Sequence, residues 1–171
     1  NASGWVLEAG SALSGNDNTD ADPEVLVAIG ELSTSIGAAD ITEVEMVTTT
    51  ADKSEGFTIS VRVRYNEPVD VVTTGGTPTL AVTNSNAGSG SGRGPHSLSY
   101  ASGTGTNELI FSLAIAAANA ATNADDVLSV GAQTIALNSG TIKDASGTAS
   151  DAALVISGAV GTAAGSVTVT A

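Results

Sequence analysis

Residues 57–65 have the sequence Phe57-Thr58-Ile59-Ser60-Val61-Arg62-Val63-Arg64-Tyr65, in which apolar and polar side chains alternate. Successive side chains of a β-strand point to opposite faces, so the apolar ones share one face and the hydroxyl and guanidinium groups share the other. In an α-helix the same apolar residues would be scattered around the circumference. The stretch therefore predicts a β-strand that has one face in the core and one face in solvent.

A second run, Leu109-Ile110-Phe111-Ser112-Leu113-Ala114-Ile115, repeats the alternation. Clusters of Gly, Pro, Asn and Ser, such as 74–78 and 138–140, mark turns between such runs. Short strands that follow one another closely leave no room for the helices that a parallel sheet needs. The sequence therefore predicts an all-β protein, an antiparallel β-sandwich. Weaker patterns predict further strands at Ile41–Thr48, Val69–Val72, Thr79–Thr83, Ser97–Tyr100, Val127–Val130, Thr134–Leu137, Ala153–Ile156 and Ser166–Thr170.

Two segments are harder to assign. The alanine-rich stretch Ala114–Ala124 has good helix formers, but its Asn and Thr residues weaken a helix, and we interpret it mostly as a connection. Asp22-Pro23-Glu24 before Val25–Ile29 resembles a helix start, with Asp as the cap and Pro in the first turn. The same apolar run also fits a buried strand that ends at Gly30, so both alternatives stay open.

The chain has 171 residues, and its charges divide it unevenly. The formal net charge is −13, yet residues 1–45 contain acidic residues and no basic one, whereas every Lys and Arg lies beyond residue 50. This shift predicts an acidic N-terminal arm or small subdomain at 1–39, a β-sandwich at 40–157, and a C-terminal strand or tail at 158–171.

The composition excludes several chemistries. The absence of Cys excludes a disulfide scaffold, a thiolate metal site and a thiol nucleophile, and a single His excludes a site built from several histidines. A strongly acidic chain does not fit a phosphate-binding surface, so we expect no nucleic-acid partner. No apolar run is long enough to span a membrane, and the first residues lack the pattern of a signal peptide.

Four ordered motifs between Ile41 and Leu154 resemble a known family. They are the strand that runs into Asn66-Glu67-Pro68-Val69, the turn and strand Gly76-Thr77-Pro78-Thr79-Leu80, the segment 100–106 before the strand at 109–115, and Leu137-Asn138-Ser139-Gly140-Thr141-Ile142-Lys143-Asp144. These motifs are similar to those of the bacterial and phage immunoglobulin-like repeat modules, the SwmB-like or adhesin-type repeats of very large surface proteins. The loop 84–95 is longer than in a typical repeat, and residues 1–40 match no repeat.

The resemblance implies an immunoglobulin-like fold, an extracellular or particle-surface setting and no catalytic residues. In agreement with it, His96 is not accompanied by a nucleophile elbow or another arrangement typical of a catalytic triad, so we interpret it as a loop or strand-edge residue. Paired carboxylates for glycoside hydrolysis would need aromatic platforms, and four of the five aromatic residues lie in or next to predicted strands. We therefore expect no enzymatic activity.

The glycine-rich segment 88–94 contains Arg93, one of only five cations of the chain. The segment leads into Pro95 and a predicted strand rather than into a helix, so it does not fit a phosphate-binding loop. We interpret it as a connecting loop, with the alternative that Arg93 docks on an acidic neighbouring subunit. Arg93 and Trp5 are the two candidate subunit contacts.

Calcium is the one cofactor that the sequence suggests. The run Asn16-Asp17-Asn18-Thr19-Asp20-Ala21-Asp22 places oxygen ligands at alternate positions, but it lacks the turn glycine and the bidentate Glu of an EF-hand. Asp125, Asp126 and Asp144 offer further oxygen ligands. A solvated acidic loop is the other interpretation, and no cofactor is expected.

The C-terminal run Val167-Thr168-Val169-Thr170 can either close its own sandwich or pair with the sheet edge of a neighbour. The expected partners are other protein subunits of a homo-oligomeric or hetero-oligomeric assembly. The expected function is that of a virion surface protein, such as a phage capsid decoration or cement protein. The alternative is an extracellular repeat of a bacterial adhesin or giant surface protein.

Overall fold

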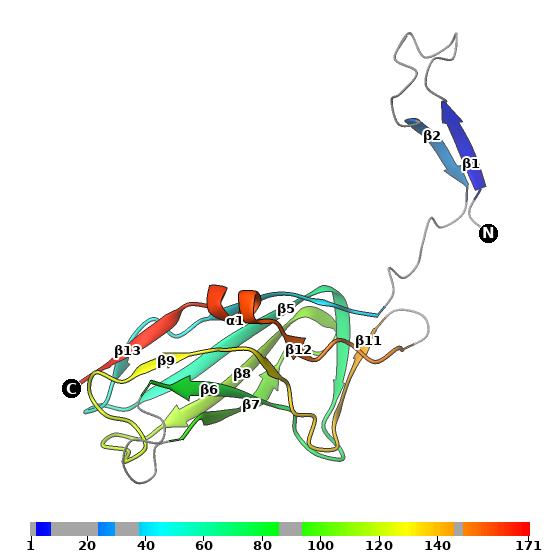
Figure 1. The fold of residues 1–171 in the computed structure, drawn as a ribbon. Helices are drawn as coiled ribbons and strands as arrows, with labels where there is room; N and C mark the ends of the chain where they lie inside the picture. Colours follow the sequence, from blue (N-terminus) through cyan, green and yellow to red (C-terminus); the bar gives the residue numbers. More distant parts are fainter. Residues whose placement is uncertain (1–2, 8–23, 30–37, 86–93, 146–148) are drawn as a thin grey trace. The chain divides into compact units, whose positions relative to one another are not determined.

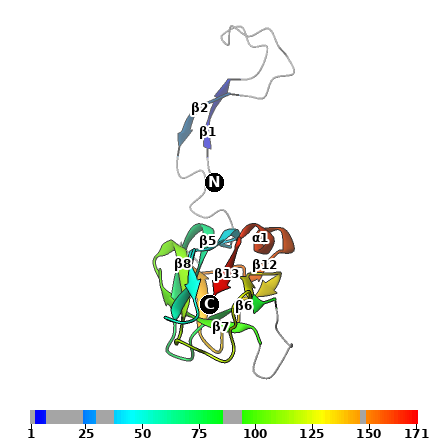
Figure 2. The same cartoon turned by 90° about the vertical axis from the view of Figure 1, so that its left-hand side faces the viewer.

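The computed structural model describes residues 3–7, 24–29, 38–85, 94–145 and 149–171. The regular structure of the described part of the chain is β-strand with one short helix, as expected for an all-β protein, and its strands pair mostly in antiparallel fashion (Figures 1 and 2). The chain falls into two compact units, Asn1–Ile36 and Gly37–Ala171. Each unit is described by itself below.

The first unit contains a two-stranded antiparallel ribbon of β1 (Ser3–Leu7) and β2 (Glu24–Ile29). Its register places Trp5 opposite Val27, and it shifts between Trp5 and Val6. Residues 25–29 are therefore a strand, which decides between the helix and strand alternatives for this apolar run. The β-branched Val and Ile residues of β2 favour this outcome.

The second unit contains one nine-stranded sheet in the order β11-β5-β8-β7-β6-β9-β13-β4, with β3 as a further neighbour of β5. Strand β5 is long because β3 and β11 share one of its edges, the first along residues 61–65 and the second along residues 69–72. The bounds are β3 (Ile41–Met46), β4 (Ala51–Asp52), β5 (Phe57–Val72), β6 (Thr79–Asn84), β7 (His96–Ser102), β8 (Thr106–Ile115), β9 (Val127–Ser129), β11 (Thr141–Asp144) and β13 (Ser166–Thr170). A small separate pair joins β10 (Gln133–Thr134) to β12 (Val155–Ile156).

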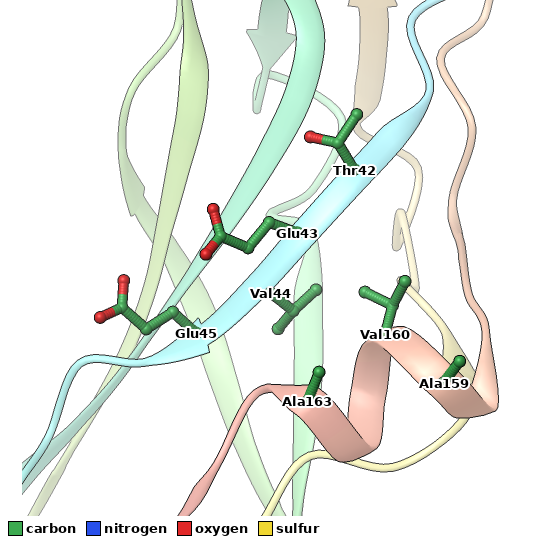
Figure 3. A pocket seen from close by; sticks show the side chains of 7 residues that line it. All are labelled: Thr42, Glu43, Val44, Glu45, Ala159, Val160 and Ala163. Atoms are coloured by element: carbon green, nitrogen blue, oxygen red, sulfur yellow. The ribbon is translucent and has the colours of Figure 1, made fainter.

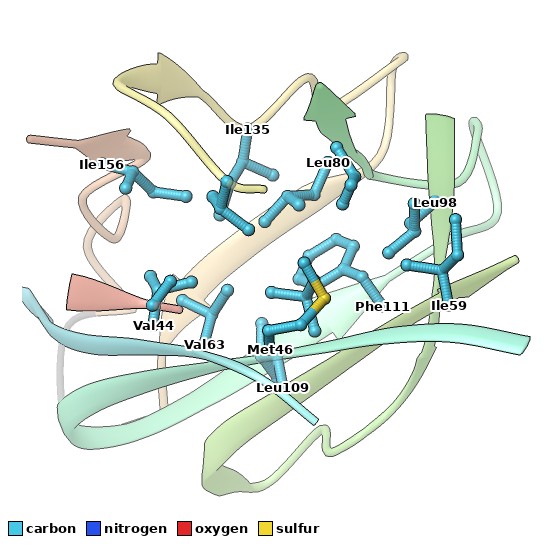
Figure 4. Close-up of a cluster of buried hydrophobic side chains, with 14 of the residues drawn as sticks. Val44, Met46, Ile59, Val63, Leu80, Leu98, Leu109, Phe111, Ile135 and Ile156 are labelled. Carbon is cyan, nitrogen blue, oxygen red and sulfur yellow. The ribbon is translucent and has the colours of Figure 1, made fainter. Parts of the chain in front are cut away.

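The inward-facing rows of these strands form the core, and Figure 4 shows side chains from β3, β5 and β8 meeting those from β6 and β7. Ile59, Val61 and Val63 are fully buried, whereas the intervening Ser60 and Arg62 are partly exposed, as the alternation predicts. The aromatic residues of the strands also lie on core faces, with Tyr65 and Phe111 buried. Core side chains of this size each stabilise the fold by about 2 kcal/mol through burial.

The segment from β3 to β4 changes partners along its length. Strand β3 pairs with β5, and after residues 47–50 the two residues of β4 pair with β13 in parallel. The predicted purely antiparallel arrangement is therefore wrong at this one pair, because the chain passes from one edge of the curled sheet to the other. Strand β13 lies between β9 and β4, so of the two alternatives for the C-terminal strand the structure shows the one in which it pairs within its own unit.

Two of the sequence motifs meet at the Val72 end of β5. Glycines 75 and 76 approach the backbone of the turn 137–140 so closely that an added Cβ at Gly76 would lie 1.7 Å from the carbonyl oxygen of Asn138. Asn138, in the left-handed conformation at φ 51°, donates its side-chain amide to the Thr77 carbonyl at 2.9 Å. Glycine is required at positions 75 and 76 because a side chain there would collide with the backbone of the turn 137–140.

A short helix, α1 (Gly158–Ala163), precedes β13 and was not predicted from the sequence. Its sequence, Gly-Ala-Val-Gly-Thr-Ala, has two glycines and two β-branched residues, which have low helix propensity. Tertiary contacts hold it in place: an added Cβ at Gly161 would lie 2.6 Å from the carbonyl oxygen of Gly131. The hydroxyl of Ser157 also caps the helix by accepting a hydrogen bond from the Val160 amide at 3.3 Å.

Candidate interaction surfaces

The outer face of β3, β5 and β8 has a row of alternating charges. Arg64 of β5 forms ion pairs with Glu43 at 2.6 Å and with Glu108 at 2.7 Å, and Arg62 pairs with Glu45 and, at 3.7 Å, with Glu108. These are cross-strand neighbours, which the register of the three strands places side by side. The arginines of the predicted strand thus face outward, as their positions predict.

These pairs shift the pKa of their members in the direction expected for opposite charges. The hydrogen bond from Arg64 lowers the pKa of Glu108, with the nearby charges of Arg62 and Arg64 adding to it. The same hydrogen bond and the charge of Glu43 raise the pKa of Arg64. The face is held ionised and ordered, but each pair is open to water, so its effect on stability is small.

A buried polar cluster lies near the Phe57 end of β5, where the connection 116–126 follows β8. Asn84 donates its side-chain amide to the Asp126 carboxylate at 2.7 Å, and the Asn123 amide donates to the same oxygen at 2.8 Å. His96 Nε2 and the Thr122 hydroxyl share a hydrogen bond of 3.2 Å. Burial lowers the pKa of His96, and the charge of Asp126 opposes that shift. The cluster therefore fastens the connection to the ends of β6 and β7.

Lys53 joins two further segments, β13 and the connection 116–126, at this end. Its amide donates to the Thr170 carbonyl at 3.0 Å, its carbonyl accepts from the Ala118 amide at 2.9 Å, and its ammonium donates to the Asn123 side chain at 3.0 Å. Ala118 and Asp125 have positive φ values of 57° and 69°. The connection is held in a conformation that side-chain and backbone hydrogen bonds must stabilise.

A groove of about 390 Å³ lies between β3 and α1 (Figure 3). Ala159, Val160 and Ala163 point from the helix toward the strand, and Val44 lies across from them. Glu43 and Glu45 also line the groove, and in the close-up their carboxylates point away from the helix. The volume lies at the small end of the range for ligand sites.

The candidate residues named from the sequence are placed as follows. Arg93 and the acidic run Asn16–Asp22 lie outside the described residues, and of Trp5 only the backbone position in β1 is described. Asp125 is exposed, whereas Asp126 and Asp144 are buried. Within the described ranges no group of three or more His, Asp or Glu side chains is arranged to hold a metal ion.

His96, predicted to be a loop or strand-edge residue, is the first residue of β7, but the sequence did not predict its burial in a polar cluster. The signal was present in the alternation. Asn84 continues the inward row of Leu80 and Val82, and His96 begins the inward row that continues with Leu98. A polar residue at the end of an apolar row is therefore a candidate for a buried, hydrogen-bonded role.

Comparisons with protein-family models, with curated proteins and with solved structures find no match. Among the described residues, no helix has the length and apolar character needed to cross a membrane.

Proposed function

We propose that the chain is a non-enzymatic structural and interaction protein of a phage particle surface, such as a capsid decoration or cement protein. The observation that carries the proposal is the division into two units, a β-ribbon in Asn1–Ile36 and a β-sheet unit with its own core in Gly37–Ala171. A subunit that attaches to a lattice needs one part that folds independently and one part that makes contact. An isolated two-stranded ribbon is marginally stable in water, which favours a contact role for the first unit.

The second unit is proposed to be an immunoglobulin-like sandwich. Its order, β3-β5-β8-β7 followed by β6-β9-β13-β4, fits two packed sheets joined where β7 pairs with both β8 and β6. The switch of the first strand, from β5 to a parallel pair with β13, supports the same proposal. The motifs that resemble the repeat family serve turns of this unit, as the contact of Gly76 with Asn138 illustrates.

Several polar residues in the described part of the second unit have structural partners, which supports a role without catalysis. His96 is bonded to Thr122, Asp126 accepts from Asn84, and the outer-face arginines are paired with glutamates. The proposed setting is a particle surface or another extracellular surface, and the proposed partners are protein subunits rather than nucleic acid. No cofactor is assigned, and calcium at the acidic run stays a prediction.

Antibodies against the chain test this proposal on two fractions of the culture that carries the gene: purified particles and washed cell envelopes. We expect the chain on particles at many copies each, visible by immunogold labelling. Its presence on envelopes alone, within a longer polypeptide, would replace the proposal with the adhesin-repeat alternative. That alternative is kept because the four motifs resemble a repeat module.

A further inference from the structure

The peptide bond between Ala121 and Thr122 lies in the buried polar cluster, and polar side chains contact it on both sides. Thr122 is fully buried, and its hydroxyl lies 3.2 Å from Nε2 of His96. The side-chain amide of Asn84 donates to the carbonyl oxygen of Ala121 at 3.3 Å. A base therefore contacts the hydroxyl of one residue, and a hydrogen-bond donor contacts the carbonyl of the residue before it.

His96 is suited to take a proton from this hydroxyl. Burial lowers the pKa of His96 and the charge of Asp126 opposes that shift, so the ring is neutral at about pH 7. When the ring proton is on Nδ1, Nε2 accepts the hydrogen bond from the Thr122 hydroxyl. A hydroxyl that is bonded to a general base is an activated oxygen nucleophile.

We propose that the chain cleaves its own backbone between Ala121 and Thr122, in a single reaction that begins with attack by the Thr122 hydroxyl on the carbonyl before it. The inference goes beyond the proposed function and does not rest on it. A chain that reacts once with itself has no external substrate and no turnover, so the proposal is compatible with a non-enzymatic role.

The reaction has two steps. In the first, the Thr122 oxygen bonds to the Ala121 carbonyl carbon while His96 removes the hydroxyl proton. The Asn84 amide stabilises the negative charge that develops on the carbonyl oxygen. The C–N bond then breaks, the Thr122 nitrogen takes the proton from His96, and Ala121 is left as an ester of the Thr122 hydroxyl. In the second step water hydrolyses this ester, which releases the Ala121 carboxylate and leaves Thr122 with a free amine and its hydroxyl restored.

The backbone around this bond favours the reaction. Neither Ala121 nor Thr122 belongs to a strand, so the bond can change its geometry without breaking a strand pair. Ala118 and Asp125 of the same connection have positive φ values, and cleavage allows such strained conformations to relax. Ala121 is only partly buried, which gives water access to the ester.

The two products are expected to stay together in the folded protein. The fragment that begins at Thr122 contains β9, which pairs with β6, and β11, which pairs with β5. Cleavage is therefore visible only under denaturing conditions, where these strand pairs are lost.

The experiment follows the purified full chain at neutral pH with protease inhibitors, by denaturing electrophoresis and mass spectrometry. We expect two fragments, at isolation or over the following days, one ending at Ala121 and one beginning at Thr122. Their summed mass should exceed that of the intact chain by one water molecule. Hydroxylamine attacks esters much faster than amides, so it should speed the cleavage and leave a hydroxamate on Ala121.

Two substitutions of the nucleophile separate the chemistry from packing. Thr122→Val removes the hydroxyl, so we expect no cleavage at this bond, whereas Thr122→Ser keeps the hydroxyl and should still be cleaved. Thr83→Val is the matched control, because the Thr83 hydroxyl bonds to Ser129 and takes no part in the proposed reaction. It should be cleaved at the wild-type rate.

His96→Gln tests the general base and should slow the cleavage at least about a hundredfold. The proposal is overturned if the wild-type chain stays intact with and without hydroxylamine, if the cut lies at another bond, or if Thr122→Val is cleaved as fast as the wild type. The wild-type fragments and the hydroxamate on Ala121 decide the question even where a variant does not fold. None of these results bears on whether the chain is found on particles, so the two proposals can fail separately.

Discussion

The two ends of β5 are held by different means. At the Val72 end, Gly75 and Gly76 contact the turn 137–140 backbone to backbone, with almost no space for a side chain. At the Phe57 end, Gly56 also approaches the backbone of residues 115–117 closely and Lys53 adds backbone hydrogen bonds, but the buried part of the connection 116–126 is held by the side chains of Asp126, Asn84 and His96. The first end therefore depends on the shape of the backbone, and the second depends on hydrogen bonds and on the charge state of its members. This difference predicts how each end responds to substitution and to pH.

The largest effect is expected at the glycine end. Gly76→Ala places a Cβ 1.7 Å from the Asn138 carbonyl oxygen, so one backbone must move. We expect the free energy of unfolding to fall by about 3–5 kcal/mol, measured by urea denaturation. Gly131→Ala is the matched control, because a Cβ there meets nothing within 4 Å. Equal stability of the two variants would show that the turns are not in backbone contact.

A smaller effect is expected at the side-chain end. Asp126→Asn keeps an acceptor for Asn84 and Asn123 but removes the charge that strengthens both hydrogen bonds. The expected loss is about 1–3 kcal/mol. Asp125→Asn is the control, since Asp125 is exposed and Asn tolerates its positive φ equally well. If the control loses as much as Asp126→Asn, the buried carboxylate does not fasten the connection.

The side-chain end should also respond to pH. Burial lowers the pKa of His96 in the folded state, so below about pH 6.5 the unfolded chain binds the proton more readily than the folded chain. The contribution of neutral, buried His96 to the free energy of unfolding is therefore fully present above about pH 6.5, and it is lost as the pH falls below the pKa of this histidine in the unfolded chain. We expect His96→Gln to remove this part of the pH dependence in thermal unfolding between about pH 7 and pH 5.

The wild-type protein and the variant Gly76→Ala provide the comparison for the pH measurement. Gly76→Ala should lower the unfolding temperature while keeping the wild-type slope against pH, because no titrating group lies in its contact. A wild-type protein with the same stability at pH 7 and pH 5 would contradict the account of His96. The lowered pKa values of the Glu108 and Asp52 carboxyl groups affect stability only at more acidic pH, where protonation removes the charge of each carboxylate and weakens its hydrogen bonds to Arg64 and Ser54.

The smallest effect is expected on the outer face. Glu108→Gln removes one partner of Arg64 and Arg62, but all three side chains are open to water and the arginines keep Glu43 and Glu45. We expect little change in the unfolding temperature at moderate salt, and a difference that disappears as salt is added. A loss as large as that of Asp126→Asn would mean that the charged row contributes to folding as the buried cluster does.

The sequence predicted the strands well where alternation was strong. The runs at 57–65 and 109–115 are parts of β5 and β8, and each of the eight weaker strands overlaps a named strand. The weaker run at 134–137 overlaps β10 only at Thr134. Helix α1 was missed because its glycines and β-branched residues predict no helix, and the contact of Gly161 with Gly131 overrides that local preference.

The interaction surfaces were less predictable than the strands. The groove between β3 and α1 joins residues 42–45 to 159–163, and no local pattern links segments so far apart. The buried cluster likewise joins Asn84, His96 and Asp126 from three segments. The only sequence signal for this cluster is that Asn84 and His96 lie at the ends of inward-facing rows of apolar residues. The predicted contacts of Arg93 and Trp5 stay predictions.

The most direct test of the central claim, that one unit folds and the other attaches, compares the full chain with residues 37–171 on purified particles from which the protein has been stripped. The account predicts saturable rebinding of the full chain, no rebinding of 37–171, and the same thermal unfolding of the sheet unit in both. Equal rebinding of both chains would contradict the division of roles, and no rebinding of either would contradict the particle-surface proposal.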